Sequence, residues 1–319
     1  MARKILSLKV KRNTDVELDD NKLKTEKIED PQKRFLDGIA VNPSEPIRLE
    51  SGSEQFTMRA MDLITPIGMG QRGLIVAPPA CGKTTILKHI CQSVGEAYPD
   101  IKLYALLIDE RPEEVTDFKR SVPAQVHASS SDNSYEQHVR VADDLLKIAC
   151  REAGSGHDVM IVIDSLTRLS RVHNAERKGR GRTMSGGIDA RAMEIPRKMF
   201  GAARKIEGGG SLTILATVLV DTGSRMDQVI FEEFKGTGNM ELVLSREVAR
   251  QRIFPALDIA KSSTRREELL IDSKDIESIR VLRRALGSLK PIEGAGKLVE
   301  LLEKYPANAE LLSRFSRKE

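Results

Sequence analysis

Residues 73–85 read Gly–Leu–Ile–Val–Ala–Pro–Pro–Ala–Cys–Gly–Lys–Thr–Thr, an apolar strand that runs directly into a phosphate-binding loop. Small residues in such a loop let successive backbone N–H groups point at phosphate oxygens, and the following helix adds the positive end of its dipole. Lys83 is expected to reach the outer phosphates, and the Thr84 hydroxyl is a suitable ligand for Mg²⁺. The stretch therefore predicts a nucleoside triphosphate site that includes Pro79, Ala80, Cys81, Gly82, Lys83, Thr84 and Thr85.

The sequence around this loop supports the motif. Apolar residues recur at helical spacing between Ile86 and Val94, which places the loop between a strand and an amphipathic helix. The alternative is an accidental Gly–Lys–Thr at the start of a helix, which the flanking strand and helix disfavour. Ala77 departs from the general pattern, because it stands where the first glycine is usual. Residues 68–73 match a dinucleotide fingerprint but precede the strand instead of following it, so that interpretation is rejected.

The composition limits the class of protein. With 319 residues and 40% hydrophobic content the chain can bury a full core, and we expect one large domain with an appendage. The net charge is only +4, so any contact with nucleic acid depends on a local basic patch. Three cysteines without a CxxC pair favour a reducing compartment. No apolar run approaches about 18 residues, so we expect a cytoplasmic protein that does not contact a membrane.

Apolar runs alternate with helical patterns along most of the chain. The runs are rich in β-branched residues, as in strands buried on both faces; they cover residues 73–77, 103–108, 159–163, 212–220 and 240–245. The alternation predicts an α/β fold with a mostly parallel sheet and with ligands at the carboxyl ends of the strands. Residues 1–51 are expected to form a short extended or partly β appendage. Residues 52–319 are expected to form the nucleotide-binding domain, with a helical tail interrupted at Pro291 and Pro306.

Carboxylates follow two of the expected strands. Residues 159–163 end in Asp164, which is placed to hold the magnesium shell. Residues 106–108 lead into an acidic run, residues 109–114, where an attacking water would need orientation and a proton acceptor. Any carboxylate of this run could be that base. The alternative is a solvated loop or helix start favoured by the helix dipole.

Two glycine-rich basic segments are candidates for gripping a phosphate backbone. Residues 177–187 combine Lys and Arg with repeated Gly, and residues 221–226 form a shorter loop of similar character. The alternative for both is an ordinary flexible surface loop.

Two single residues carry further hypotheses. Arg265 lies in a polar turn, where it could complete the phosphate site of a neighbouring molecule, or belong to a helix start with surface ion pairs. Cys81 lies at the start of a helix beside Lys83, which would favour a reactive thiolate; the alternative is an inert small residue that fills the loop.

Several longer strings carry a specific resemblance. They are GLIVAPP (73–79), LLIDERPEEVT (106–116), DSLTR (164–168), FGAAR (200–204), GGSLT (209–213), DTGS (221–224) and FEEFKGTGNMEL (231–242). Over about residues 35–315 the chain closely resembles the family of the bacterial transcription termination factor Rho. The resemblance implies a RecA-like P-loop NTPase fold and a homohexameric, RNA-dependent ATPase and helicase. It further implies ATP and Mg²⁺ as cofactors, and single-stranded RNA, RNA polymerase and its transcription factors as partners.

The resemblance also implies roles for individual residues. Lys83 and Thr84 match the phosphate and Mg²⁺ residues, Asp164 the aspartate of the magnesium shell, and Glu110 the carboxylate that activates water. The remaining matches are Arg111 for a γ-phosphate contact, Phe254 for the aromatic ring that stacks on adenine, and Arg265 for the arginine finger offered to the neighbouring subunit. RNA in the central pore is implied to contact Arg182, Thr183, Ser185, Thr222, Gly223, Ser224 and Arg225.

The sequence departs from the family pattern at three places. Ala80 stands where the family usually has a lysine, and Arg182 and Arg225 stand where it has pore lysines. Residues 1–50 hold one aromatic, Phe35, so we expect no complete OB barrel of the kind that binds RNA ahead of the family's ATPase domain. Two functions follow as hypotheses. The first is an ATP-driven RNA translocase in transcription termination, and the alternative is a shortened paralogue that acts as a regulatory or non-translocating subunit.

Overall fold

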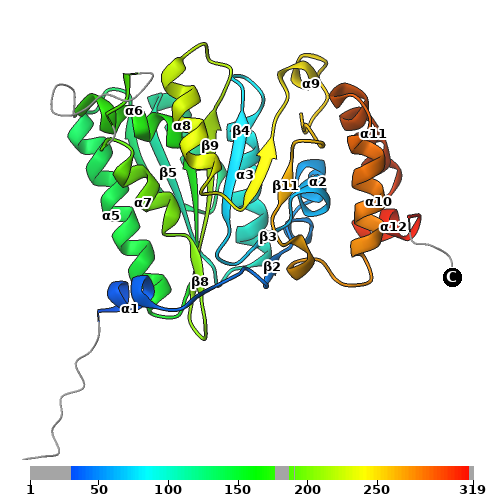
Figure 1. Ribbon diagram of the computed structural model, residues 1–319, viewed down its shortest axis with the longest axis horizontal. Helices are drawn as coiled ribbons and strands as arrows, with labels where there is room; N and C mark the ends of the chain where they lie inside the picture. Colours follow the sequence, from blue (N-terminus) through cyan, green and yellow to red (C-terminus); the bar gives the residue numbers. More distant parts are fainter. Residues whose placement is uncertain (1–29, 177–186, 190, 316–319) are drawn as a thin grey trace, which may run out of the picture.

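The computed structural model describes residues 30–176, 187–189 and 191–315. Its centre is a sheet with the strand order β11, β10, β4, β9, β7, β5, β6 (Figure 1). The strands from β10 to β6 run parallel, whereas β11 pairs antiparallel with β10. Their bounds are β11 Ser263–Thr264, β10 Met240–Val243, β4 Arg72–Ala77, β9 Ser211–Leu219, β7 Asp158–Asp164, β5 Lys102–Glu110 and β6 Gln125–Ser130. The expected α/β fold with a mostly parallel sheet is confirmed.

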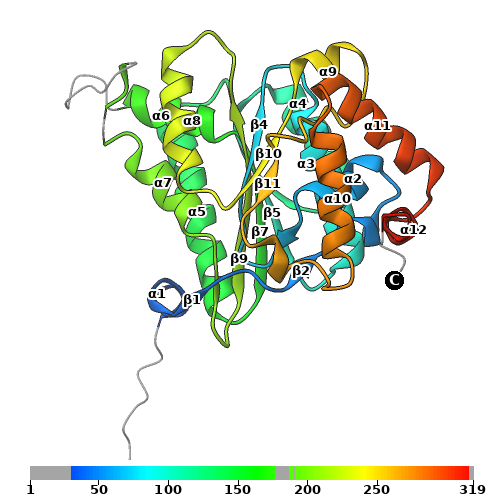
Figure 2. The same cartoon turned by 45° about the vertical axis from the view of Figure 1, so that its right-hand side comes forward.

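Helices cover both faces of this sheet, which gives three layers (Figures 1 and 2). Side chains alternate along the strands. Leu74 and Val76 of β4 belong to the core under one helical layer, and Ile75 and Ala77 belong to the other. One layer contains α5 (Tyr135–Gly154), α6 (Leu166–Glu176), α7 (Glu194–Gly201) and α8 (Arg225–Lys235). The other contains α2 (Phe56–Ile64), α3 (Lys83–Ala97), α4 (Pro112–Ser121) and the C-terminal helices.

The apolar runs identified the central strands correctly but missed β6. Each of the five expected runs overlaps one of β4, β5, β7, β9 and β10. β6 occupies the edge of the sheet beside β5, and most of its residues are only half-buried. A strand with one free edge needs no continuous apolar run, so its sequence carries a weak signal.

The described part of the N-terminal segment packs onto the same cores. Helix α1 (Pro31–Asp37) lies against α5 and buries Phe35. Strand β1 (Ala40–Val41) pairs with β8 (Arg204–Ile206), which in turn pairs with β9; β2 (Pro46–Ile47) pairs with β3 (Ile67–Gly68). The expected extended segment is therefore wrong at α1, because Asp30 caps this helix and Pro31 occupies its first turn instead of breaking it. The boundary at residue 51 stays a prediction, and residues 1–29 lie outside the described residues.

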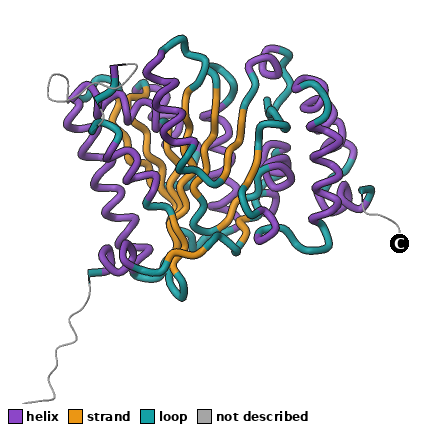
Figure 3. The backbone as a smooth tube through the Cα atoms, viewed as in Figure 1, coloured by secondary structure: helices purple, strands orange, loops and turns teal. Residues whose placement is uncertain are grey.

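The C-terminal tail is helical, as expected. It forms α10 (Ile276–Gly287), α11 (Pro291–Lys304) and α12 (Asn308–Ser313), and Figure 3 shows these helices beside the sheet domain. Leu282, Leu298 and Leu302 join the core that α2 and α3 also line. The remaining described elements are α9 (Arg246–Arg250) and the 3-10 turns Glu50–Gly52 and Glu267–Leu269. Among the described residues, no helix is both long and apolar enough to cross a bilayer.

Candidate active site

The phosphate loop lies between β4 and α3, as its sequence predicts. Two of its residues adopt left-handed backbone conformations, Ala80 with φ 63° and Gly82 with φ 87°. Gly82 needs this freedom for its conformation and not for space, because a Cβ there would lie 4.0 Å from the nearest atom, on the ring of Phe254. The turn brings Lys83 to the first position of α3. Backbone N–H groups at this helix start have no partner within the helix, so they are available to an anion.

Four polar side chains meet at the carboxyl ends of β7 and β9. The Lys83 ammonium lies 2.7 and 2.8 Å from the two carboxylate oxygens of Asp164. The Thr84 hydroxyl donates to Asp164 Oδ2 at 2.9 Å, and the Thr217 hydroxyl donates to Oδ1 at 2.8 Å. Asp164 is thus buried but fully engaged, and the structure brings together three residues that the sequence assigned to one site: Lys83, Thr84 and Asp164.

Glu110 joins this cluster from the end of β5. Its side chain is only 4% exposed, and one carboxylate oxygen lies 3.6 Å from the Lys83 ammonium and 3.1 Å from Nε of Arg168. Burial, and next the charge of Asp164, raises the pKa of Glu110 from 4.5 to about 7, against the opposing effect of Lys83 and Arg168. A carboxylate poised near neutral pH is suited to accept a proton from water.

The structure separates Glu110 from the other carboxylates of the acidic run. Asp109 has a φ of 57°, and the register of β5 with β6 shifts at this point, so Glu110 lies inside the site. Glu113 and Glu114 lie in the first turn of α4, where the solvated helix start was the alternative. Arg111 does not join the cluster. Its side chain is 72% exposed and lies 3.8 Å from Glu114.

The raised pKa of Glu110 gives a prediction about pH. Only the ionised carboxylate accepts a proton, so we expect kcat/KM for ATP to fall about tenfold per pH unit as the pH drops below the Glu110 pKa of about 7. Steady-state ATPase rates across this range measure it. The residual activity of Glu110→Gln should show no such inflection, and a wild-type profile that stays flat through pH 7 would contradict the assignment.

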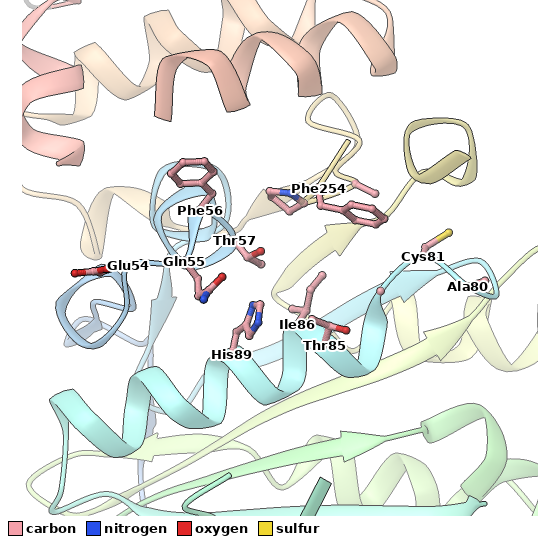
Figure 4. Close-up of a pocket in the computed structure, with 13 residues that line it drawn as sticks. Glu54, Gln55, Phe56, Thr57, Ala80, Cys81, Thr85, Ile86, His89 and Phe254 are labelled. Atoms are coloured by element: carbon pink, nitrogen blue, oxygen red, sulfur yellow. The ribbon is translucent and has the colours of Figure 1, made fainter. Parts of the chain in front are cut away.

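A cavity of about 660 Å³ adjoins the phosphate loop (Figure 4). Phe254 lies at this cavity and is 47% exposed, so its ring is free to stack on a planar group. Thr85 and His89 line it from one face of α3, one turn apart. A further part of the lining comes from the start of α2. The lining residues are Glu54, Gln55, Phe56, Thr57, Ala80, Cys81, Gly82, Thr85, Ile86, His89, Phe254, Pro255 and Ala256.

Sequence reasoning missed the α2 wall and His89. Glu54, Gln55, Phe56 and Thr57 carry no motif, and only the chain path brings them to the cavity. His89 could have been found, because it lies four residues after Thr85 and therefore on the same face of the helix. Burial lowers the pKa of His89 below its usual value, which favours a neutral imidazole.

The expectation of a reactive thiolate at Cys81 is wrong. Its side chain is buried, and Sγ lies 3.7 Å from the carbonyl oxygen of Pro79. Burial raises the pKa of Cys81, and this effect outweighs the nearby positive charge of Arg246. Desolvation thus overrides the helix dipole, and Cys81 acts as a small residue that fills the loop.

The residues expected to contact RNA divide into two groups. Arg182, Thr183 and Ser185 lie outside the described residues. The second group follows β9 and consists of Thr222, Gly223, Ser224 and Arg225. Directly after β9, the N–H of Val220 donates to the carbonyl of Ala77 at 3.2 Å. This loop is therefore adjacent to the phosphate loop.

Hydroxyl groups hold this second loop in place. The Thr222 hydroxyl donates to Asp227 at 2.6 Å, and the Ser224 hydroxyl accepts from the N–H of Asp227 as the cap of α8. Asp227 is buried and also accepts from Arg171 of α6. Arg225 is exposed at the first position of α8. The hydroxyl groups thus shape the loop, and Arg225 offers its charge to solvent.

Arg265 lies far from the phosphate loop of its own chain. Its N–H donates to the carbonyl of Asn239 at 2.9 Å, directly before β10. Met240 at the start of β10 is in register with Gly73 near the amino end of β4. The exposed Arg265 is therefore at the amino edge of the sheet, whereas the phosphate loop follows the carboxyl edge. Within one chain, the structure does not bring Arg265 to Lys83.

The residues present fit a magnesium ion held jointly with phosphate oxygens. Among the described residues, no group of three His, Cys, Asp or Glu side chains forms a metal cage. Mg²⁺ commonly uses only one or two protein ligands beside water and substrate phosphates. The Thr84 hydroxyl and the Asp164 carboxylate, 2.9 Å apart, supply that donor set.

Comparisons with known proteins agree with this geometry. Residues 57–264 match the nucleotide-binding domain of the ATP synthase alpha/beta family. The chain is 51% identical over 283 residues to transcription termination factor Rho of Streptobacillus moniliformis, covering 88% of this chain and 68% of the relative. It is 48% identical over 274 residues to Rho of Haemophilus influenzae, covering 85% and 65%. It is 49% identical over 280 residues to Rho of Streptosporangium roseum, covering 88% and 73%. The chain thus spans about two thirds of the length of these relatives.

Solved structures show the same fold in more distant proteins. An ATPase from the type III secretion system of pathogenic bacteria superposes with a TM-score of 0.70 at 24% identity, covering 88% of this chain and 82% of that one. The assembled ATPase EscN from enteropathogenic E. coli gives a TM-score of 0.69 at 23% identity, covering 88% and 68%. At this level of identity the likeness concerns the fold alone.

Proposed function

The chain belongs to the family of transcription termination factor Rho and contains an ATPase nucleotide-binding domain, and from this premise we propose that it hydrolyses ATP to move along single-stranded RNA and thereby end transcription. The observation that carries the ATP-hydrolysing part of the proposal is the buried Glu110 carboxylate, 3.6 Å from the Lys83 ammonium, and the part that concerns RNA and termination rests on the Rho relatives. This pair lies at the phosphate loop, which the cavity of about 660 Å³ adjoins. RNA polymerase and its transcription factors are the proposed partners, and the cytoplasm is the proposed compartment.

The chemistry follows from the positions of these side chains. The phosphate loop and Lys83 bind the phosphates, and Phe254 stacks on the adenine. Mg²⁺, held by Thr84 and Asp164, would neutralise charge on the phosphoryl group that is transferred. Glu110 orients a water and accepts its proton, because its pKa of about 7 leaves a substantial ionised fraction at neutral pH. Arg168, 3.1 Å from Glu110, keeps that carboxylate aimed into the site.

A ring would complete the site. Arg265 lies at the sheet edge away from the phosphate loop of its own chain, and this position supports a role for it at the site of another subunit. We propose a homohexamer in which each Arg265 stabilises the charge that develops in its neighbour's reaction.

The proposal is tested by measuring ATP turnover with and without poly-cytidine RNA. A motor requires RNA to stimulate hydrolysis. The rival function, a regulatory or non-translocating subunit, requires turnover that does not respond to RNA. If RNA does not stimulate ATP hydrolysis in a preparation shown to form rings, this result would contradict the translocase.

The two basic segments that are expected to contact RNA, residues 177–187 and 221–226, give a second prediction. We expect the double change Arg182→Ala and Arg225→Ala to remove RNA stimulation and leave basal hydrolysis intact, because neither residue matches a nucleotide-site position. Each lost phosphate contact should also lower the salt slope of binding to single-stranded RNA by about 0.7. Binding titrations at several salt concentrations measure the slope. Arg171→Ala is the contrasting variant, because it removes the charged partner of Asp227 and should disturb the fold of the loop. Unchanged stimulation in the double variant would contradict pore binding.

A further inference from the structure

We propose that α11 acts as a strut in the cavity beside the phosphate loop, which we call the base cavity. It sets the distance between two walls, Phe56 with Thr57 on one side and Phe254 to Ala256 on the other. Arg59 is the positioning residue that attaches the first wall to the end of α11. The inference rests on the proposed function, since it requires the cavity to receive the base of ATP. Arg59 and α11 themselves lie outside the cavity lining and outside the phosphate loop.

The first wall is fastened to the end of α11 by Arg59. Phe56 and Thr57 begin α2 and line the cavity, and Arg59 follows two residues later. The Arg59 guanidinium donates to the carbonyl of Leu302 at 2.8 Å and to that of Tyr305 at 2.7 Å. These carbonyls lie at the C-terminus of α11, where backbone acceptors lack helical partners and a positive charge is favoured. The Arg59 side chain is 5% exposed, so these bonds are shielded from water.

The second wall packs on the first half of the same helix. Phe254, Pro255 and Ala256 line the cavity on this side. Ala256 and its neighbour Ile253 form a small apolar cluster with Ala295 and Ile292 of α11, together with Val248 and Ala249 of α9. A Cβ added at Gly296 would lie 3.8 Å from Ile253, so this face of α11 touches the loop directly. Figure 4 shows the C-terminal helices in their orange tint above Phe56 and Phe254.

Further bonds keep the Arg59 end from shifting. The Asn308 side chain donates to the Arg59 carbonyl at 3.0 Å, and the Asn308 N–H donates to Glu50 Oε1 at 2.7 Å. The same Glu50 oxygen lies 3.5 Å from Nε of Arg59. Asp62 of α2 accepts the N–H groups of Leu49 and Glu50 at 3.0 and 2.8 Å. The start of α2 is thus joined to α12 and to the chain before it.

A helix keeps a fixed length between its attachment points. Ala295 and Leu302 are seven residues apart in sequence, about 10 Å along the axis of α11. Because both walls attach to one rigid element, their separation is set before a base enters, and binding needs little reorganisation. Loosening either attachment should therefore weaken ATP binding without touching the groups that perform hydrolysis.

Three variants test the strut in the full chain. Arg59→Met removes the bonds to both carbonyls of α11, and Arg59→Lys keeps a positive charge that reaches one of them. Ala295→Leu places a larger side chain in the apolar cluster that joins α11 to Ala256. For Arg59→Met we expect roughly tenfold weaker binding of a fluorescent ATP analogue and a matching rise in KM, with kcat at saturating ATP unchanged. Arg59→Lys should recover part of this loss, and Ala295→Leu should weaken binding on its own.

Arg283→Met is the matched control. Arg283 of α10 also donates to a backbone carbonyl, that of Ser262 at 3.0 Å, and pairs with Glu267, yet it contacts neither wall. It should lower the melting temperature and leave analogue affinity unchanged. Folded Arg59→Met or Ala295→Leu with wild-type affinity would overturn the strut. If Arg59→Met does not fold, the affinity of Ala295→Leu for the analogue decides whether the strut is correct. A wild-type protein that fails to bind the analogue would overturn the proposed function instead.

Discussion

Glu110→Gln is expected to bind ATP normally and to hydrolyse it about 10²–10⁴-fold more slowly, the usual contribution of a positioned general base. The amide keeps the shape of the carboxylate but cannot accept a proton from water. Glu110 is nearly inaccessible to solvent, so bulk water cannot replace it as the acceptor. Before ATP binds, the Lys83 ammonium of the variant keeps its bonds to both oxygens of Asp164, and the phosphate loop should therefore stay in place.

Two measurements separate this role from a structural one. Titration with a fluorescent ATP analogue gives affinity, and single-turnover hydrolysis gives the chemical rate. Glu113→Gln is the control, since it makes the same change two positions past Arg111 in the exposed first turn of α4. The control should keep the wild-type rate. If Glu110→Gln loses affinity while its chemical rate per bound ATP is normal, Glu110 holds the loop and is not the base.

The sequence predicted the central sheet and the phosphate site because both depend on local patterns. Strands buried on both faces must be apolar runs, and these runs located β4, β5, β7, β9 and β10. Glycine at an αL position before a lysine and a helix is a local signature too, and Gly82 has that conformation. Edge elements such as β6 lack this constraint and were missed.

The identity of the base could not be read from residue types alone. Four carboxylates lie between residues 109 and 114, and each could have served. What distinguishes Glu110 is the bulge at Asp109 together with Lys83 and Arg168, which come from other parts of the chain. Cys81 shows the same limit. Its sequence neighbours favour a thiolate, but burial, which is a tertiary property, decides its pKa.

The cavity walls and their support are tertiary features as well. Phe56 and Thr57 reach the cavity through the chain path, and Arg59 reaches α11 across more than two hundred residues of sequence. Arg266, the next residue after Arg265, forms a surface ion pair, since its Nε donates to Glu268 at 2.6 Å. Arg265 lies at the amino edge of the sheet, and its role as an arginine finger in a neighbouring subunit stays a proposal.

Arg265→Ala is expected to lower kcat by about 10³–10⁵ in the assembled ring, the effect of an arginine finger in nucleotide hydrolases. ATP affinity and assembly should change little, because the Arg265 side chain is exposed and the bond to the Asn239 carbonyl is made by the backbone N–H, which the variant keeps. ATPase rates and sedimentation of the nucleotide-bound protein measure both. Arg266→Ala is the control, because that side chain pairs with Glu268 of its own chain.

Mixing two inactive variants tests whether Arg265 acts in the neighbouring subunit. In a ring of Arg265→Ala and Glu110→Gln subunits, some interfaces join an intact Glu110 from the first variant to an intact Arg265 from the second. Those interfaces should hydrolyse ATP, so the mixture regains activity that neither variant has alone. An Arg265 that served its own chain would give no recovery, since every subunit would lack one of the two groups. The opposite sheet edges on which Arg265 and the phosphate loop lie make recovery the expected result.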